Sequence, residues 1–208
     1  DRATMHVYGA SDYAVTKEGG DYTVHIVVGI DERHQIYVLD LWRQQASPDV
    51  WIEAFCDLVR KWRPIGWAEE GGQIRSGIGP FLTKRLLERK LYVVRAQFPT
   101  RGDKAVRAQS IRGRMAMQGL HLPSNAGWLP DFQNELMAFP NGRHDDCVDA
   151  LGLIGQVLDK MIGGSGPALE AEKPKVFSTV PGECTVTMDD LWEANEKYRS
   201  KGRNLRIA

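Results

Sequence analysis

Acidic side chains that could bind a divalent metal ion recur at three separated places in the sequence. Two of these places directly follow short apolar runs, and the third begins a long apolar segment. Carboxylates gathered in one pocket repel one another and raise one another's pKa unless a cation neutralises them. The cations that carboxylate oxygens favour are Mg²⁺ and Mn²⁺. A metal site is therefore predicted if the fold brings together the acids Asp12, Glu69, Glu70, Asp145, Asp146 and Asp149.

Each acid also has a purely structural explanation when it is taken alone. Asp145 or Asp146 could cap the helix that follows by accepting hydrogen bonds from its first N–H groups. Asp12 could begin a loop, and Glu69-Glu70 could lie in a solvated turn. His144 is expected in a loop, where it could hydrogen-bond an acid, because the sequence offers it no partners for a zinc ion.

Basic residues are clustered, although 27 Lys and Arg against 27 Asp and Glu give a formal net charge of zero. One cluster runs from Arg95 to Arg114, and a second runs from Lys197 to Arg206. Affinity for a polyanion would have to come from such local patches rather than from the field of the whole molecule. A solvated face is the alternative for either cluster.

The composition indicates an ordinary globular chain of 208 residues, with 42% hydrophobic and 26% charged residues. No stretch approaches the roughly 20 apolar residues that a bilayer span needs, and the first residues lack a signal-peptide pattern. We therefore expect a soluble, cytoplasmic protein that is not secreted and has no membrane partner. Cys56, Cys147 and Cys184 form no CxxC pair, so reduced thiols are expected.

Hydrophobic periodicity predicts an alternation of strands and helices. Strands are expected near residues 5–10, 22–30, 35–42, 65–68 and 91–98, the first three as an antiparallel meander. Helices are expected from Pro48 to just before Pro64, and near 78–89, 104–117, 128–139 and 145–161. Gly119 should end the basic helix over 104–117, and a small extended piece should follow at 120–122.

This order would bring the acids together. Strands that end at the same edge of a sheet commonly build sites there, and Asp146 and Asp149 share one face of the last helix because they are three residues apart. The succession is the layout of a ribonuclease H-like fold. The expected fold class is therefore α/β, with a central mixed five-stranded sheet flanked by helices and a flexible C-terminal tail.

The segment Phe139-Pro140-Asn141-Gly142-Arg143-His144-Asp145-Asp146-Cys147-Val148-Asp149-Ala150-Leu151 resembles the third nuclease motif of tailed-phage terminase large subunits, F-P-x-G-[KR]-H-D-D-x-x-D-A-L. Ser11-Asp12-Tyr13-Ala14, with the later Asp21-Tyr22, is similar to the first motif of that family, and Glu70-Gly71-Gly72-Gln73-Ile74 is similar to the second. Asp103-Lys104-Ala105-Val106-Arg107-Ala108 resembles a basic motif between the second and third. The resemblance covers roughly residues 5 to 160.

The resemblance implies a two-metal-ion endodeoxyribonuclease that cuts concatemeric viral DNA during genome packaging. It implies catalytic and metal-binding roles, with two Mg²⁺ or Mn²⁺ ions, for Asp12, Glu70, Asp146 and Asp149. Glu70 is preferred to Glu69 because it matches the family's E-x-G-x-I pattern, and Asp145 is expected to be a cap or to support a neighbouring acid. The side chains expected to contact DNA are Arg101, Lys104, Arg107, Arg112 and Arg114.

The same resemblance implies partners and a division of the chain. The partners would be double-stranded DNA, a packaging ATPase domain of the same full-length protein, the portal and the small terminase subunit, in the cytoplasm of a bacterial host. No GxxxxGK[ST] motif is present, so ATP hydrolysis is not expected from this chain. We expect a nuclease domain over 1–161, a linker over 162–186 and a short helix with a basic tail over 187–208.

Two other functions fit the same residues. A Holliday-junction resolvase or a transposase-like nuclease would keep the fold and the acids but would act on a different DNA substrate. A docking module without catalytic activity would bind DNA or the portal and leave DNA uncut. Cleavage of plasmid DNA in the presence of metal separates a nuclease from a docking module.

Overall fold

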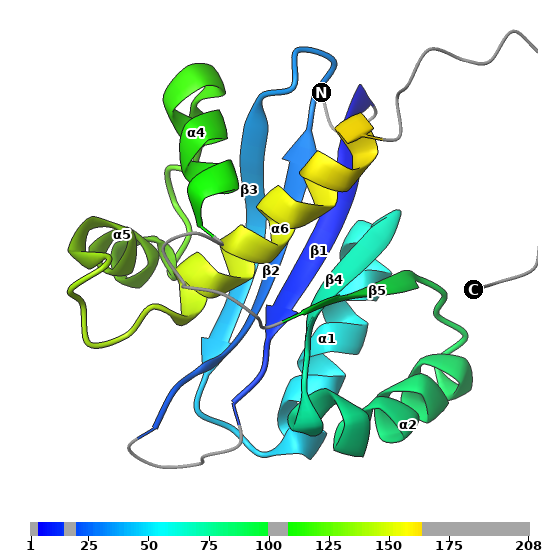
Figure 1. Ribbon diagram of the computed structural model, residues 1–208. Coiled ribbons are helices and arrows are strands. Elements are labelled where there is room, and N and C mark those ends of the chain that lie inside the picture. The colour runs from blue at the N-terminus through cyan, green and yellow to red at the C-terminus, as the bar shows by residue number, and fades with distance from the viewer. Residues whose placement is uncertain (1–3, 15–19, 100–107, 164–208) are drawn as a thin grey trace, which may run out of the picture. The chain divides into compact units, whose positions relative to one another are not determined.

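A mixed six-stranded sheet forms the centre of the computed structural model, which describes residues 4–14, 20–99 and 108–163 (Figure 1). The strand order is β5-β4-β1-β2-β3-β6. β1 pairs antiparallel with β2 and β2 with β3, whereas β4 runs parallel to β1, β5 to β4 and β6 to β3. The strands are β1 (His6–Asp12), β2 (Thr23–Ile30), β3 (Ile36–Gln44), β4 (Gly66–Gly71), β5 (Val94–Pro99) and β6 (Leu120–His121).

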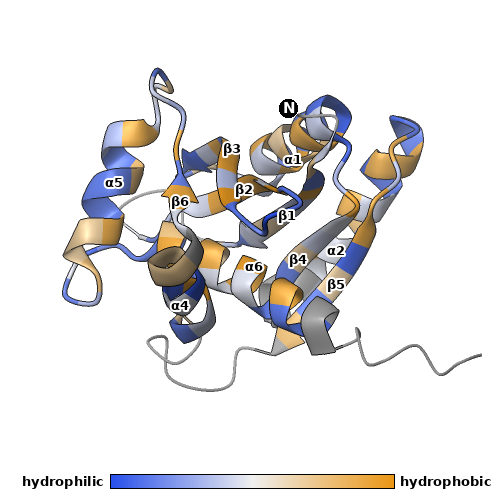
Figure 2. Ribbon diagram, turned by 90° about the horizontal axis from the view of Figure 1, so that it is seen from above, coloured by the Kyte–Doolittle hydropathy of each residue, from blue (hydrophilic) through white to orange (hydrophobic). Residues whose placement is uncertain are grey.

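Helices cover both faces of this sheet, as the view from above shows (Figure 2). On one face, α6 packs along β1 and β2, and α4 and α5 pack against α6. On the other face, α1 packs against β2 and β3, and α2 packs against β4. The helices are α1 (Pro48–Trp62), α2 (Gln73–Glu88), α4 (Gln109–Gln118), α5 (Leu129–Ala138) and α6 (Asp146–Gly163).

Two hydrophobic cores fill the space between the sheet and its helices. The core under α6 includes Ile26, Phe132 and Ile154, and the core under α1 includes Trp51 and Trp67. Every residue of β2 is buried, as expected for an apolar strand that lies between two neighbours and is covered on both faces. The end of β1 is therefore held rigidly in the middle of the sheet.

Close approaches between elements depend on two glycines. A Cβ atom on Gly9 of β1 would lie 2.2 Å from the ring of Trp67, so this indole packs directly over the strand. A Cβ atom on Gly155 of α6 would lie 2.9 Å from the backbone nitrogen of Ile111 in α4. A larger side chain at residue 9 would displace the Trp67 ring from β1, and one at residue 155 would separate α4 from α6.

The predicted fold class is confirmed, with two corrections. The sheet has six strands rather than five, because the extended piece after Gly119 pairs with β3; two residues are too short to show a strand pattern. α2 begins at Gln73 rather than near residue 78, since Gly and Pro in its first half hide the helical periodicity. Leu82 and Leu86 of this helix are buried, whereas Phe81 and Leu87 are exposed.

The predicted end of the basic helix agrees with the structure, because Gly119 has a φ of 83° directly after α4. α6 continues to Gly163, two residues beyond the predicted domain boundary at 161. The predicted linker beyond Gly163, the short helix and the basic tail lie outside the described residues. Cys56 and Cys147 are free and buried. Within the described ranges, none of the helices has the length and apolar character needed to cross a membrane.

Candidate metal centre

The parallel pairing of β1 with β4 brings the first two predicted acids together. Ser11 lies opposite Glu69 in the register, so the next residues along each strand, Asp12 and Glu70, share the face of the sheet that α6 covers. The pKa of Asp12 is raised well above its ordinary value. Burial is the largest cause, followed by the negative charges of Glu70, Asp149 and Asp146 and a side-chain hydrogen bond with Glu70. The predicted acids of β1, β4 and α6 therefore lie within electrostatic reach of one another.

Asp146 lies at the first position of α6 and is 3% exposed. Burial raises the pKa of its carboxyl to about 6; the charges of Glu135 and Asp21 also raise it, while a hydrogen bond from the backbone N–H of Tyr22 lowers it. Its Oδ2 atom is buried and accepts no hydrogen bond from the described residues. A buried carboxylate oxygen of this kind is costly unless a cation or a proton reaches it.

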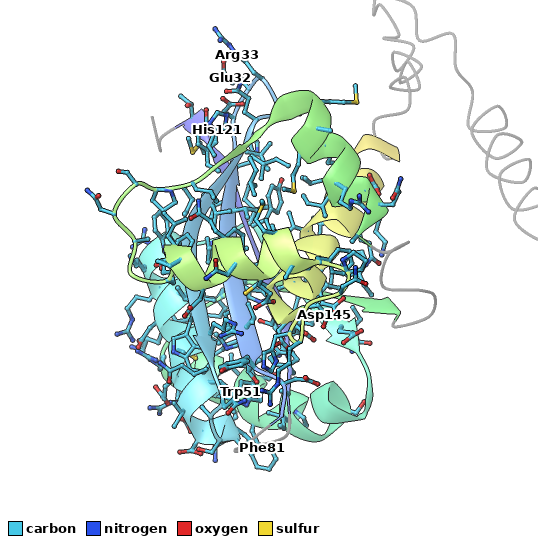
Figure 3. The ribbon with its side chains drawn as sticks, turned by 90° about the vertical axis from the view of Figure 1, so that its left-hand side faces the viewer. Glu32, Arg33, Trp51, Phe81, His121 and Asp145 are labelled. Carbon is cyan, nitrogen blue, oxygen red and sulfur yellow. The ribbon has the colours of Figure 1, made fainter. Side chains whose placement is uncertain are left out.

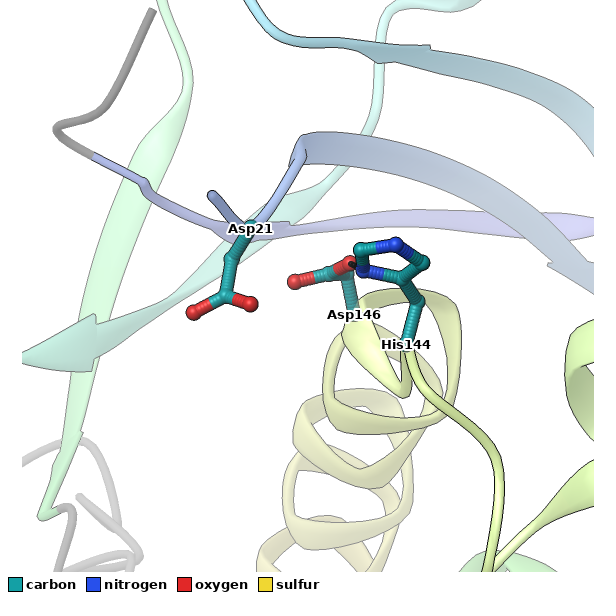
Figure 4. A group of neighbouring side chains, drawn as sticks. All are labelled: Asp21, His144 and Asp146. Atoms are coloured by element: carbon teal, nitrogen blue, oxygen red, sulfur yellow. Dashed lines mark ion pairs between the residues drawn. The ribbon is translucent and has the colours of Figure 1, made fainter. Parts of the chain in front are cut away.

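Two neighbours of Asp146 were not among the predicted ligands. Asp21, just before β2, and His144, in the loop before α6, join Asp146 so that one possible ligand atom from each lies within 4.8 Å of the others (Figure 4). The Nδ1 atom of His144 is 3.8 Å from Oδ2 of Asp146. The sequence alone offered His144 no partner for a zinc ion; in the fold, Asp21 and Asp146 lie close enough to share a metal ion with it. The sequence does offer one indication that Asp21 could be a ligand, because this residue belongs to the first motif and lies ten residues after its start at Ser11.

Buried contacts fix the start of α6, which Asp145 marks in Figure 3. Glu135 of α5 accepts a hydrogen bond from the backbone N–H of Cys147 and pairs with the guanidinium of Arg43, at 3.1 Å between Oε2 and Nε. The same guanidinium lies 3.5 Å from the ring centroid of Tyr22, whose ring meets that of His144 edge to face. Glu135 thus contacts the first turn of α6, which the sequence alone did not predict.

Asp145 occupies the position immediately before α6. Its backbone oxygen accepts a hydrogen bond from the N–H of Asp149 at 2.9 Å, as expected for the residue that precedes the first turn. Its predicted role as a cap or a supporting acid stays a prediction. Because Asp146 and Asp149 both belong to the first turn of α6, their side chains can reach the same side of the helix.

Glu69 and Glu70 have different environments because successive side chains of a strand point to opposite faces. Glu69 is completely buried on the face covered by α1 and α2, where its carboxylate accepts hydrogen bonds from Tyr13 and Arg95. Glu70 lies on the face with Asp12 and contributes to raising its pKa. This arrangement favours Glu70 over Glu69 as the metal ligand.

The basic residues predicted to contact DNA are only partly described. Arg101, Lys104 and Arg107 lie outside the described residues. Arg112 is exposed on α4. Arg114 donates a hydrogen bond to Asp159 of α6 at 2.7 Å, and its side chain is 15% exposed. Arg114 therefore connects α4 to α6, which leaves less of its guanidinium available to a phosphate than predicted.

The donor set of this centre suits a hard divalent cation. Carboxylates from three elements supply oxygen atoms, and one imidazole lies beside them. The buried Oδ2 of Asp146 and the raised pKa of Asp12 both indicate excess negative charge that a cation would neutralise. Mg²⁺ and Mn²⁺ match oxygen-rich sites of this type, and an imidazole ligand is better suited to Zn²⁺.

Solved structures with a similar fold include nuclease domains of phage large terminase subunits. The large terminase nuclease from thermophilic phage G20c with bound zinc is 17% identical, with a TM-score of 0.52 over 73% of this chain and 80% of that one. The nuclease domain of the large terminase subunit gp2 of bacterial virus Sf6 is 12% identical, with a TM-score of 0.54 over 72% and 87%. A variant of that domain with manganese and beta-thujaplicinol gives 0.55 at 12% identity, over 72% and 87%. At these identities the likeness establishes the fold.

No curated protein matches the sequence. The family described as the terminase RNaseH-like domain matches residues 9–154, which include Asp12, Glu70, Asp146 and Asp149. This match spans more than half of the chain, and it agrees with the fold of the phage terminase nucleases. The chain therefore belongs to the terminase RNaseH-like domain family.

Proposed function

We propose that this chain is a metal-dependent endonuclease that hydrolyses phosphodiester bonds of double-stranded DNA during viral genome packaging. The observation that carries the proposal is the gathering of the carboxylates of Glu70, Asp146 and Asp149 within electrostatic reach of Asp12 at the end of β1. The Oδ2 atom of Asp146 is buried and accepts no hydrogen bond from the described residues. Membership of the terminase RNaseH-like family supports the reaction class. Relatives of the same fold that contain zinc or manganese support the use of a divalent ion.

Each acid has a distinct part in this proposal. Asp12 lies among the other three and would contact two ions, while Glu70 and Asp146 would hold one each. Asp149 would complete or orient the ligands of the second ion. When bound, two divalent ions would activate a water molecule and stabilise the leaving 3′ oxygen.

Asp21 and His144 extend the ligand set on the side of Asp146. His144 is turned by its ring contact with Tyr22, so that Nδ1 faces the carboxylate of Asp146. Its neutral form can supply a nitrogen lone pair to a metal ion. We propose that these two residues adjust which divalent ion is preferred, in addition to the four acids predicted from the sequence.

DNA binding is assigned to the basic segment before and within α4. Arg101, Lys104, Arg107 and Arg112 would contact backbone phosphates near the scissile bond, and Arg114 would mainly support α4 through Asp159. Contacts to phosphate position a duplex without reading its sequence. That property suits an enzyme that cuts viral DNA at many sequences. A packaging ATPase domain, the portal and the small terminase subunit are the proposed protein partners.

Conversion of supercoiled plasmid into nicked and linear DNA tests this function. We expect conversion with Mg²⁺ or Mn²⁺, none with EDTA, and a loss of at least 100-fold for Asp146→Asn, because ligand loss removes the metal from the reaction. The matched control is Asp131→Asn, which makes the same change at an exposed acid in the first turn of α5. It should retain activity.

Three results would redirect the assignment. Binding of plasmid without cutting would favour a docking module. Preferential cutting of a four-way junction over the plasmid would favour a resolvase. Equal activity of Asp146→Asn and the native protein would contradict the proposed role of the acids.

A further inference from the structure

Behind the metal centre, on the opposite face of the sheet, lies a second group of interacting side chains. It consists of Tyr13, Glu69 and Arg95, which we call the rear clamp. Tyr13 directly follows Asp12, and Glu69 directly precedes Glu70. Each of these two residues is thus the immediate chain neighbour of a proposed metal ligand but points away from the metal.

The rear clamp joins the two strands that carry those ligands. The hydroxyl of Tyr13 donates to Oε1 of Glu69 at 2.5 Å. The guanidinium of Arg95, in β5, donates to the same carboxylate, with Nη2 2.9 Å from Oε1 and Nε 3.1 Å from Oε2. Arg95 also donates from Nη1 to the hydroxyl of Thr83 in α2 at 3.0 Å. The end of β1 is therefore connected through β4 and β5 to α2.

Stability alone is a poor explanation for this group. Glu69 is completely buried and the Arg95 side chain is 12% exposed, so both charges lose most of their contact with water. A buried ion pair often contributes no more to stability than well-packed apolar side chains of similar size. The ion pair instead fixes the orientation of the Glu69 carboxylate. A bidentate guanidinium contact restricts that carboxylate far more closely than apolar packing would.

The face opposite the rear clamp needs such a constraint. Asp12 and Glu70 approach each other closely enough to share a hydrogen bond, and the charges of Glu70, Asp149 and Asp146 all act on Asp12. Repulsion between these carboxylates would separate the ends of β1 and β4 in the absence of a cation. The hydrogen bond from Tyr13 to Glu69 opposes that separation, because it crosses between the same two strand ends.

We propose that Tyr13, Glu69 and Arg95 are positioning residues, which fix the separation of Asp12 and Glu70 and thereby set the affinity of the centre for a divalent metal ion. This inference rests on the proposed function, since it requires that Asp12 and Glu70 bind a metal. It assigns to Glu69 a role other than that of a ligand. It also explains why two adjacent glutamates occur at the end of β4, one facing each side of the sheet.

Calorimetric titration of the full chain with Mn²⁺ tests the inference. Tyr13→Phe keeps the ring and removes the hydroxyl, and Glu69→Gln keeps the shape and removes the charge. Loss of a residue that orients metal ligands typically weakens metal binding roughly 10- to 100-fold, and we expect at least a tenfold rise in the Kd for Mn²⁺ in both variants. Glu53→Gln is the matched control, because Glu53 accepts from Arg85 and Arg89 on the same side of the sheet but lies on α1.

A second readout separates positioning from general damage to the fold. The Mn²⁺ concentration for half-maximal plasmid cleavage should rise in Tyr13→Phe, while the rate at saturating Mn²⁺ should stay within a few-fold of the native rate. Native-like Kd values in Tyr13→Phe and Glu69→Gln would overturn the inference and leave the proposed function intact. Absence of Mn²⁺ binding by the native chain would instead overturn the proposed function, and the inference with it. If Glu69→Gln does not fold, Tyr13→Phe alone decides.

Discussion

The carboxyl of Asp146 makes the metal-free fold less stable at neutral pH. Its pKa in the folded chain is about 6, raised chiefly by burial, whereas an aspartate in an unfolded chain titrates near 3.9. Between those values the folded state binds more protons than the unfolded state, so the free energy of unfolding falls as the pH rises. The shift in pKa corresponds to a decrease in the free energy of unfolding on the order of 3 kcal/mol at pH 7.

The first prediction concerns Asp146→Asn in EDTA. Because the amide carries no charge to desolvate, the variant should lose this part of the pH dependence and should be more stable than the native protein at pH 7.5, but not at pH 4. Urea unfolding at several pH values measures the difference. Parallel pH profiles for the two proteins would show that Asp146 is not the group responsible.

The second prediction is that a bound metal ion stabilises the folded chain through Asp146, which without metal lowers its stability. An ion that binds only the folded state raises the free energy of unfolding, by about 2.7 kcal/mol when its concentration is 100 times the Kd. Mn²⁺ should therefore raise the Tm of the native chain and of Asp131→Asn, and should have much less effect on Asp146→Asn. Equal Tm shifts in all three would place the bound ion elsewhere.

At the scale of elements, the first turn of α6 depends on a carboxylate from another helix. Glu135 is buried, accepts from the N–H of Cys147 and pairs with Arg43 of β3. Removing one partner of a buried charge pair leaves the other charge uncompensated, which typically costs about 3 to 5 kcal/mol. The position of Asp146 should therefore be sensitive to residue 135.

The third prediction is that Glu135→Ala lowers the free energy of unfolding by roughly 3 kcal/mol. Asp131→Ala, an exposed acid in the first turn of α5, is the matched control and should cost less than about 1 kcal/mol. Urea denaturation of both variants measures the two costs. If Glu135→Ala lowers the free energy of unfolding no more than Asp131→Ala does, Arg43 and the N–H of Cys147 must find other hydrogen-bond partners.

Elements with strong periodicity were predictable from the sequence, and contacts between distant elements were not. β2 is mostly apolar and α6 is apolar around most of its surface, so the sequence predicts both. The start of α2 was missed because Gly and Pro hide its period. Glu135 was missed because its partner Arg43 is 92 positions away in the sequence.

The site was predictable to the extent that a motif or a strand pattern identified it. The acids of β1, β4 and α6 could be named because they end strands or begin a helix. The family pattern already preferred Glu70 to Glu69, and the pairing of β1 with β4 adds the face of the sheet that each side chain takes. Asp21 was missed as a ligand because it lies outside the strand, in a segment whose path the sequence does not specify.

At the scale of the whole molecule, the proposed DNA binding would have to come from local charge, since the net charge is zero. The fourth prediction is that replacing Lys104 and Arg107 by Ala weakens binding about equally for unrelated sequences. The slope of log affinity against log salt should flatten by roughly one per lost phosphate contact. Lys84→Ala, on α2, is the control and should bind normally. A loss confined to one DNA sequence would indicate base recognition instead.

The fifth prediction is that a chain ending at Gly163 folds and still cuts DNA. α6 ends at that residue, and every proposed ligand lies before it. The Gly, Pro, Ser, Glu and Lys composition of residues 164–182 is poor in the apolar side chains that a packed core needs. Plasmid cleavage and the Tm of the shortened chain should be close to native, with weaker DNA binding at higher salt. Unfolding of the shortened chain would contradict the domain boundary.

The most direct test of the central claim is a crystal structure of the native chain with Mn²⁺, using the anomalous signal of the ion. We predict two peaks about 3.5 to 4 Å apart, one between Asp12 and Glu70 and the other between Asp12 and Asp146. The buried Oδ2 atom of Asp146 should be a ligand of the second ion. An absence of peaks among these carboxylates at saturating Mn²⁺, or Mn²⁺ bound only elsewhere, would contradict the account.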